Sequence, residues 1–201
     1  MRTNNYQTQA DLSRELFLTF DQEAVIRKLK LPHDGEYLYV RFMDVPLRVG
    51  RATGIIEGCG DGDTETPIAV YDYLCCSHEN RNLSGTWVTT ESVGLSFHRG
   101  LTSGGLFAQM AQYFDARPAE LETACATLGG QKRAPGNVCS VLPLFDELFV
   151  WLQFWRGDDE FPAKLTLLWD QNVTQYVHYE TLYYIASMMF ARLKLKGLYA
   201  Q

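Results

Sequence analysis

The sequence predicts an α+β fold in which helices pack on one mostly antiparallel sheet of roughly five to seven strands, with the C-terminal helix covering the sheet. Two observations support this prediction. Short runs of alternating or continuous apolar residues, typical of strands, are densest in the last third of the chain. Segments with apolar residues at every third or fourth position, typical of amphipathic helices, lie before and after those runs.

The first part of the chain predicts helices followed by a hairpin. Apolar residues recur at helical spacing over residues 6–31, and Asp21 is suited to cap a second segment, which indicates two short helices or one kinked helix. Pro32 stops this pattern. Residues 37–43 then alternate between apolar and other side chains, and residues 45–49 are expected to pair with them as a hairpin.

The middle of the chain alternates between helical and extended patterns. A helix beginning at Thr66 or Pro67 has a core-facing stripe, and a later helix opens at Pro118 and is closed by a pair of glycines. Residues 92–100 show a less regular pattern. The other expected elements are strands over 53–57 and 86–90 and helices over 106–114 and 118–128.

The last third carries the strongest local signal. Residues 138–144, 148–155 and 164–169 read as strands, and RGDDEFP turns the chain between the last two. The strand over 148–155 is apolar on one face and largely aromatic on the other, which predicts a central strand with both faces covered. A helix over 179–196, with a stripe of apolar residues, is expected to end the chain and pack on the core.

Size and composition indicate one globular domain over residues 1–201. Of the 201 residues, 46% are hydrophobic and 21% are charged, so the chain can bury a core without disulfides. The five cysteines are odd in number and contain no C-x-x-C pair, which indicates reduced thiols. We therefore expect the cysteines to be structural residues of the interior.

Charge and hydropathy limit the partners. Eighteen basic and twenty-four acidic residues give a net charge of −6, which disfavours nucleic acid. The N-terminal residues lack the apolar segment of an export signal, and no apolar run approaches the roughly twenty residues that span a membrane. We expect a cytoplasmic protein that binds neither nucleic acid nor membrane, with an unknown small molecule or protein as its partner.

Motifs for common cofactors and metals are missing from the sequence. The four histidines lie in unrelated contexts without H-x-x-x-H or H-E-x-x-H spacing, although His178 and Glu180 flank a predicted helix start. No G-x-S-x-G, G-x-G-x-x-G or P-loop pattern occurs. The sequence therefore predicts no metal site and no cofactor.

One group of charged residues is a candidate for chemistry. Asp158, Asp159 and Glu160 crowd three carboxylates into one turn, Asp170 ends the following strand, and Arg156 is a candidate ion-pair partner for one of the acids. Such carboxylates can bind a hard cation or transfer protons. The alternative is structural, because acidic residues and glycine are common in hairpin turns and charges discourage edge-to-edge pairing.

The run over residues 152–170, LQFWRGDDEFPAKLTLLWD, resembles the signature of a prokaryotic family, the domain of unknown function numbered 3786. Further similarities, in order along the chain, extend the resemblance over about residues 65–195. The family tends to have an arginine before the central strand where this chain has residues 143–147, PLFDE, so no role is carried over for it. The resemblance implies a context in anaerobic bacteria and archaea, and it implies no activity.

Two functional hypotheses follow. The first is a non-catalytic binding or accessory module whose hairpin, residues 155–162, contacts a partner or small ligand through Trp155, Arg156 and the three acids. The second is an enzyme in which Asp158, Asp159 and Glu160 perform acid–base or metal-assisted chemistry above a floor formed by Trp151 and Trp155. The sequence does not decide between an enzyme and a binding module.

Overall fold

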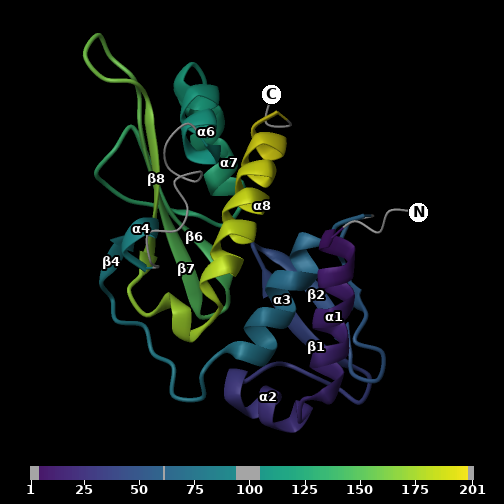
Figure 1. The fold of residues 1–201 in the computed structure, drawn as a ribbon. Coiled ribbons are helices and arrows are strands. Elements are labelled where there is room, and N and C mark those ends of the chain that lie inside the picture. Colours follow the sequence, from purple (N-terminus) through teal and green to yellow (C-terminus); the bar gives the residue numbers. More distant parts are fainter. Residues whose placement is uncertain (1–4, 61, 94–104, 199–201) are drawn as a thin grey trace.

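The fold is an α+β arrangement with two antiparallel sheets (Figure 1). The computed structural model describes residues 5–60, 62–93 and 105–198, so most of the stretch expected to be irregular lies outside the described residues. The helices are α1 (Asn5–Thr19), α2 (Gln22–Leu29), α3 (Glu65–Cys76), α4 (Thr90–Val93), α6 (Leu106–Asp115), α7 (Pro118–Thr127), the short 3-10 helix η1 (Val173–Gln175) and α8 (Tyr179–Leu198). The strands are β1 (Tyr37–Phe42), β2 (Val45–Gly50), β3 (Ile56–Glu57), β4 (Trp87–Thr89), β5 (Gln131–Lys132), β6 (Val138–Phe145), β7 (Leu148–Trp155) and β8 (Lys164–Asp170).

The expectation of one sheet is wrong, because the chain forms a three-stranded sheet ordered β1-β2-β3 and a five-stranded sheet ordered β4-β8-β7-β6-β5. The sheets stay separate because the edge of β1 that faces away from β2 is already occupied. The backbone N–H of Tyr39 donates to the carbonyl of Pro32 at 2.9 Å, and His33 bridges to Leu38, so the preceding segment occupies that edge. A hydrogen bond of 2.8 Å from the Met43 N–H to the Leu144 carbonyl links the hairpin to β6.

The two helices at the N-terminus are separate, as one of the two alternatives predicted. The side chain of Asp21 accepts hydrogen bonds from the backbone N–H groups of Glu23 at 3.0 Å and Ala24 at 3.3 Å, which caps α2. Lys30 then adopts a left-handed conformation with φ of 51° and ends α2.

Strand β7 is the middle strand of the five-stranded sheet, which confirms its predicted central position. One face is buried as expected, with Leu148, Val150, Leu152 and Phe154 in the core. The prediction that both faces are covered is only partly correct. Side chains on the opposite face are half-buried, and Trp155 is 44% exposed where the β7–β8 hairpin projects beyond the rest of the sheet (Figure 1).

Helices α6, α7 and α8 lie on one side of the five-stranded sheet (Figure 1). The buried apolar residues around the three-stranded and the five-stranded sheet form one continuous core. Helix α3 packs between α1 and α8, which brings the end of α3 and the beginning of α8 together (Figure 1). Within the described residues, none of the helices has the length and apolar character needed to cross a membrane.

Candidate metal centre

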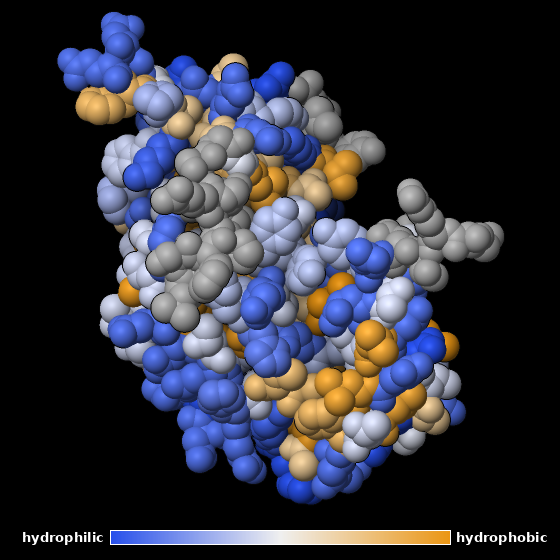
Figure 2. Space-filling view, viewed as in Figure 1, coloured by the Kyte–Doolittle hydropathy of each residue, from blue (hydrophilic) through white to orange (hydrophobic). Residues whose placement is uncertain are grey.

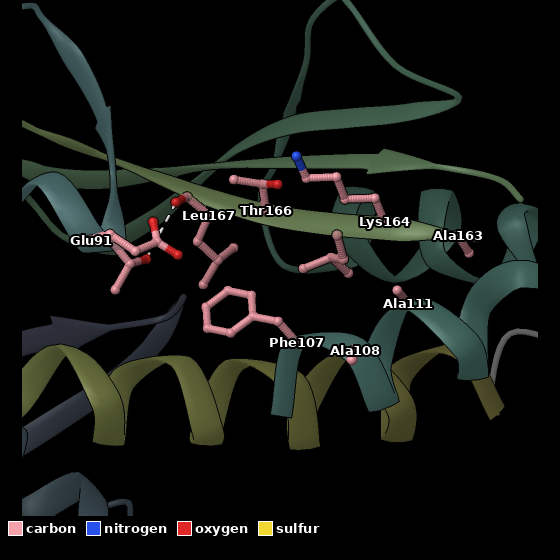
Figure 3. Close-up of a pocket in the computed structure, with 10 residues that line it drawn as sticks. Glu91, Phe107, Ala108, Ala111, Ala163, Lys164, Thr166 and Leu167 are labelled. Carbon is pink, nitrogen blue, oxygen red and sulfur yellow. Dashed lines mark hydrogen bonds between the residues drawn. The ribbon is translucent and has the colours of Figure 1, made fainter. Parts of the chain in front are cut away.

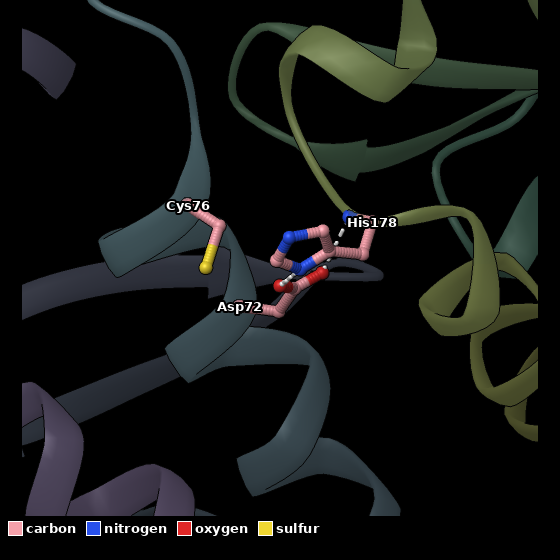
Figure 4. A group of neighbouring side chains, drawn as sticks. All are labelled: Asp72, Cys76 and His178. Carbon is pink, nitrogen blue, oxygen red and sulfur yellow. Dashed lines mark hydrogen bonds and ion pairs between the residues drawn. The ribbon is translucent and has the colours of Figure 1, made fainter.

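Three potential metal ligands meet where α3 ends and α8 begins. Asp72 and Cys76 are four residues apart on α3, and His178 immediately precedes α8 (Figure 4). Each offers one ligand atom, a carboxylate oxygen, a thiol sulfur and an imidazole nitrogen, and these atoms lie within 4.8 Å of one another. Ligands around tetrahedral zinc are about 3.5 Å apart, so donors within 4.8 Å of one another are close to the separation that such a site requires.

The helical period explains why α3 presents two of these groups on one flank. The core-facing positions of α3, which include Tyr71, Leu74 and Cys75, are buried against the rest of the molecule. Residues four apart in a helix share a face, so Asp72 and Cys76 both lie at the half-buried border of this apolar surface.

Asp72 holds His178 with two hydrogen bonds. The backbone N–H of His178 donates to Asp72 Oδ2 at 2.7 Å, and His178 Nδ1 lies 2.5 Å from Asp72 Oδ1. A carboxylate can only accept, so Nδ1 carries the proton of this hydrogen bond. A metal ion bound by both side chains would take the place of this proton, between Nδ1 of His178 and the carboxylate of Asp72.

The thiol of Cys76 is protonated at neutral pH. Burial, the negative charge of Asp72 and a hydrogen bond to Asp72 raise the pKa of Cys76 to about 11. Cysteine nucleophiles need a lowered pKa, so this Cys–His–Asp group lacks the thiolate of a cysteine hydrolase. A bound divalent cation reverses the effect, because its positive charge favours the thiolate.

A pocket of about 380 Å³ adjoins these residues, between α1, α3 and the first turns of α8. Among the described residues, its wall contains no lysine and no arginine. Leu16, one of the exposed leucines of α1, lines this pocket, and Figure 2 shows hydrophobic residues gathered over α1. The pocket residues outside α3 and His178 are Gln9, Ser13, Leu16, Glu180, Thr181 and Tyr184.

The predicted carboxylate cluster lies elsewhere, at the tip of the β7–β8 hairpin. Asp158, Asp159 and Glu160 are all exposed, and none of them lines the pocket beside His178. Asp158 Oδ1 accepts hydrogen bonds from the backbone N–H groups of Phe161 at 2.8 Å and Glu160 at 2.9 Å, and these bonds lower the pKa of Asp158. The side chain of Asp158 therefore shapes the turn.

Arg156 and Trp155 occupy the base of this hairpin. Instead of pairing with a neighbouring acid, as the sequence suggested, Arg156 donates through Nε to the carbonyl oxygen of Asp115 at 3.2 Å. The proposed floor of two tryptophans does not form beneath the acids. Trp151 lies farther along β7 and donates through Nε1 to the sulfur of Cys139 at 2.8 Å.

Asp170 does not join the cluster, because β8 runs antiparallel to β7 and carries Asp170 to the opposite end of the strand from the tip. Its carboxylate accepts backbone N–H groups of Ser84 at 3.0 Å, Gly85 at 2.8 Å and Asn172 at 2.8 Å. Burial alone raises the pKa of Asp170, but these hydrogen bonds outweigh burial and lower it. The residue connects the loop before β4 to the end of β8.

Two other pockets contain no comparable group of ligands. One, of about 230 Å³, lies between α4, α6 and β8, and its two charged residues, Glu91 and Lys164, lie at opposite ends (Figure 3). The other, of about 500 Å³, borders β1 and β2. The arginines that line it, Arg41 and Arg48, are already paired with acids.

Sequence reasoning missed this group of potential ligands because it searched for histidine and cysteine pairs at short spacing. The available signal was a D-x-x-x-C pair in a half-buried helix and a histidine before a helix start. His178 is 106 residues from Asp72, and no pattern in the sequence joins the two. His98, another of the four histidines, lies outside the described residues.

The comparison with known families agrees with the resemblance seen in the sequence. Residues 21–192 match the model of the family described as "Domain of unknown function (DUF3786)", so the match begins earlier than the residues that suggested it. No curated protein and no solved structure matches the chain.

Proposed function

Because the chain belongs to the DUF3786 family, whose description assigns no activity, we propose a function from the site itself: a binding module that holds one zinc-like divalent metal ion. The ligands are Asp72, Cys76 and His178. The observation that carries this proposal is the convergence of their oxygen, sulfur and nitrogen donors within 4.8 Å.

The types of donor favour some metals over others. Calcium and magnesium prefer sites built from oxygen ligands alone, whereas zinc and cobalt accept thiolate, imidazole and carboxylate together. One sulfur, one nitrogen and one oxygen from Cys76, His178 and Asp72 therefore suit Zn²⁺ or Co²⁺. The charges also agree, because a divalent cation neutralises the Asp72 carboxylate and the Cys76 thiolate.

Metal binding stabilises the junction of two elements that are distant in sequence. Asp72 and Cys76 belong to α3, and His178 fixes the start of α8, so an ion bound by all three connects the helices directly. A ligand that binds only the folded state raises the free energy of unfolding. A role in binding agrees better than nucleophilic catalysis with a thiol whose pKa is raised.

A second candidate function, the accessory hairpin that the sequence suggested, is favoured by one observation. Phe161 at the tip is 67% exposed and Trp155 at its base is 44% exposed, although large aromatic side chains are normally buried. Exposed aromatic residues are common anchors of protein interfaces. The three acids beside them are then part of a docking surface and not a catalytic cluster.

The test of the metal site is cobalt titration of the full chain after treatment with a chelator. We expect one Co²⁺ per chain and a thiolate-to-cobalt charge-transfer band, which reports a bond to cysteine. Cys76→Ser removes that band. Cys59→Ser is the matched control, because Cys59 is also a half-buried thiol with its pKa raised to about 11 and is not part of the ligand group. A band that survives in Cys76→Ser contradicts the proposal.

A further inference from the structure

We propose that the bound metal keeps one open coordination position facing the pocket between α1 and α8, and that this position takes a small neutral nitrogen donor, an amine or imidazole, in preference to an anion. The inference rests on the proposed function, since it requires metal at Asp72, Cys76 and His178. It adds the class of ligand that the site accepts.

The number of protein ligands leaves a position free. Zinc and cobalt in tetrahedral sites take four ligands, and sites that bind external ligands use three protein groups and leave the fourth position to water or substrate. Over the residues that the structure describes, the ligand group contains three members, one each from Asp72, Cys76 and His178. Glu180 lines the same pocket but is not a member of the group.

The site is accessible from the pocket. The side chain of His178 is 64% exposed, whereas that of Asp72 is only 9% exposed. The three donors therefore form a half-open site in which Asp72 lies at the bottom and His178 at the mouth. The volume of about 380 Å³ is large enough for a small molecule beside the metal.

The charge around the pocket selects against anions. A divalent ion bound to one carboxylate and one thiolate has no net charge, so it offers no long-range attraction for an anion. Glu180 adds a negative charge to the wall, and none of the described residues that line the pocket is a lysine or an arginine. The nearest ammonium group that interacts with Cys76 belongs to Lys28, which is absent from the pocket wall and donates to the carbonyl of Cys75 at 3.4 Å.

The walls also suit a neutral nitrogen donor. α1 contributes the amide of Gln9, the hydroxyl of Ser13 and the apolar side chain of Leu16, and α8 contributes Tyr184. Aromatic and apolar groups contact a flat ring such as imidazole, and Glu180 accepts a hydrogen bond from an N–H group on the side away from the metal. An anion of the same size has no donor to offer to that carboxylate.

The experiment uses the cobalt-loaded full chain and compares imidazole with acetate at constant ionic strength. Binding is followed through the visible absorption of Co²⁺, and the thiolate charge-transfer band is recorded to show that the metal stays bound. We expect imidazole to bind at least about tenfold more tightly than acetate. Glu180→Gln should strengthen acetate binding several-fold and leave the dissociation constant of Co²⁺ unchanged. Ser13→Trp, which fills the α1 side of the pocket, should weaken imidazole binding and leave the dissociation constant of Co²⁺ unchanged.

Distinct results overturn the inference. If neither compound changes the cobalt spectrum, the coordination position is closed. If acetate binds as tightly as imidazole, the charge argument is wrong. If Glu180→Gln lowers Co²⁺ affinity tenfold or more, Glu180 is itself the fourth ligand. By contrast, a chain that binds no Co²⁺ at all contradicts the proposed function, and that result is separate from the other three.

Discussion

The hairpin tip and the metal centre contain similar polar groups in opposite arrangements. Asp158, Asp159 and Glu160 are consecutive in the sequence, yet they are exposed on a projecting turn where Asp158 bonds to the backbone. Asp72 and His178 are 106 residues apart, yet their side chains are in direct contact. The three acids that are neighbours in the sequence therefore form a turn, whereas the packing of α3 against α8 brings together candidate ligands that are distant in the sequence.

The largest expected effect is a loss of affinity for Co²⁺, which substitutions at the metal centre should cause and substitutions at the hairpin tip should not. Cys76→Ser or His178→Ala should lower the affinity for Co²⁺ by about 100-fold or more, because each removes a direct ligand. Replacing all three tip acids with alanine should leave the affinity unchanged. Isothermal titration calorimetry of the chelator-treated chain measures both. If the tip variant loses affinity for Co²⁺ and Cys76→Ser does not, the metal is bound at the hairpin tip and not at Cys76.

The second prediction concerns the pH dependence of metal binding. The thiol of Cys76, with its pKa raised to about 11, must lose its proton to bind metal. Below that pKa the bound metal competes with one proton, so the affinity for Co²⁺ should rise about tenfold per pH unit between about pH 7 and 8.5. In Cys76→Ser this dependence should become shallower. A wild-type affinity that is constant with pH would show that the thiol is not a ligand.

The third prediction compares two aspartates that both accept backbone N–H groups. Asp170 is 3% exposed, so Asp170→Ala removes a buried acceptor that forms part-buried hydrogen bonds with the backbone N–H groups of Ser84, Gly85 and Asn172, and it should lower the free energy of unfolding by about 2 kcal/mol. Asp158→Ala should have a smaller effect, because its donors at the exposed tip can bond to water. Denaturant unfolding of both variants measures these free energies. Equal losses would contradict the expectation that the buried carboxylate of Asp170 contributes more to stability than the exposed carboxylate of Asp158.

The fourth prediction is a loss of stability at alkaline pH. Burial raises the pKa of the thiols of Cys59 and Cys76 to about 11 and of Cys75 and Cys125 to about 12, above the ordinary value of 9.0. Above pH 9 the unfolded chain loses these protons first and binds fewer protons than the folded chain. The free energy of unfolding should therefore fall as the pH rises from about 9 to 11.

Thermal unfolding in chelator-containing buffers at pH 8, 9 and 10 checks this dependence. Burial also raises the pKa of Tyr71 and Tyr73, which adds to the change in the same direction. A midpoint that does not decrease over this interval would mean that the thiols are ionised in the folded chain.

Local patterns were sufficient to predict most of the fold. The α+β class, the cap at Asp21, the central strand β7 and the helix α8 all depend on residues close together in sequence, and each is confirmed. The division into two sheets was not predictable in this way, because it depends on the segment with Pro32 and His33 pairing along the edge of β1. The metal centre required knowledge of how α3 and α8 pack, which no local spacing contains.

The smallest expected effect comes from the aromatic residue at the tip. Phe161 is 67% exposed, so Phe161→Ala removes little buried apolar surface and should change the free energy of unfolding by no more than about 0.5 kcal/mol. Phe154→Ala, in the buried core of the same hairpin, is the matched comparison and should cost about 3 to 5 kcal/mol. Because an exposed phenylalanine that does not stabilise the fold is available to contact a partner, a neutral Phe161→Ala agrees with the docking role of the hairpin. A large loss of stability would instead place Phe161 in the core and remove the main support for that role.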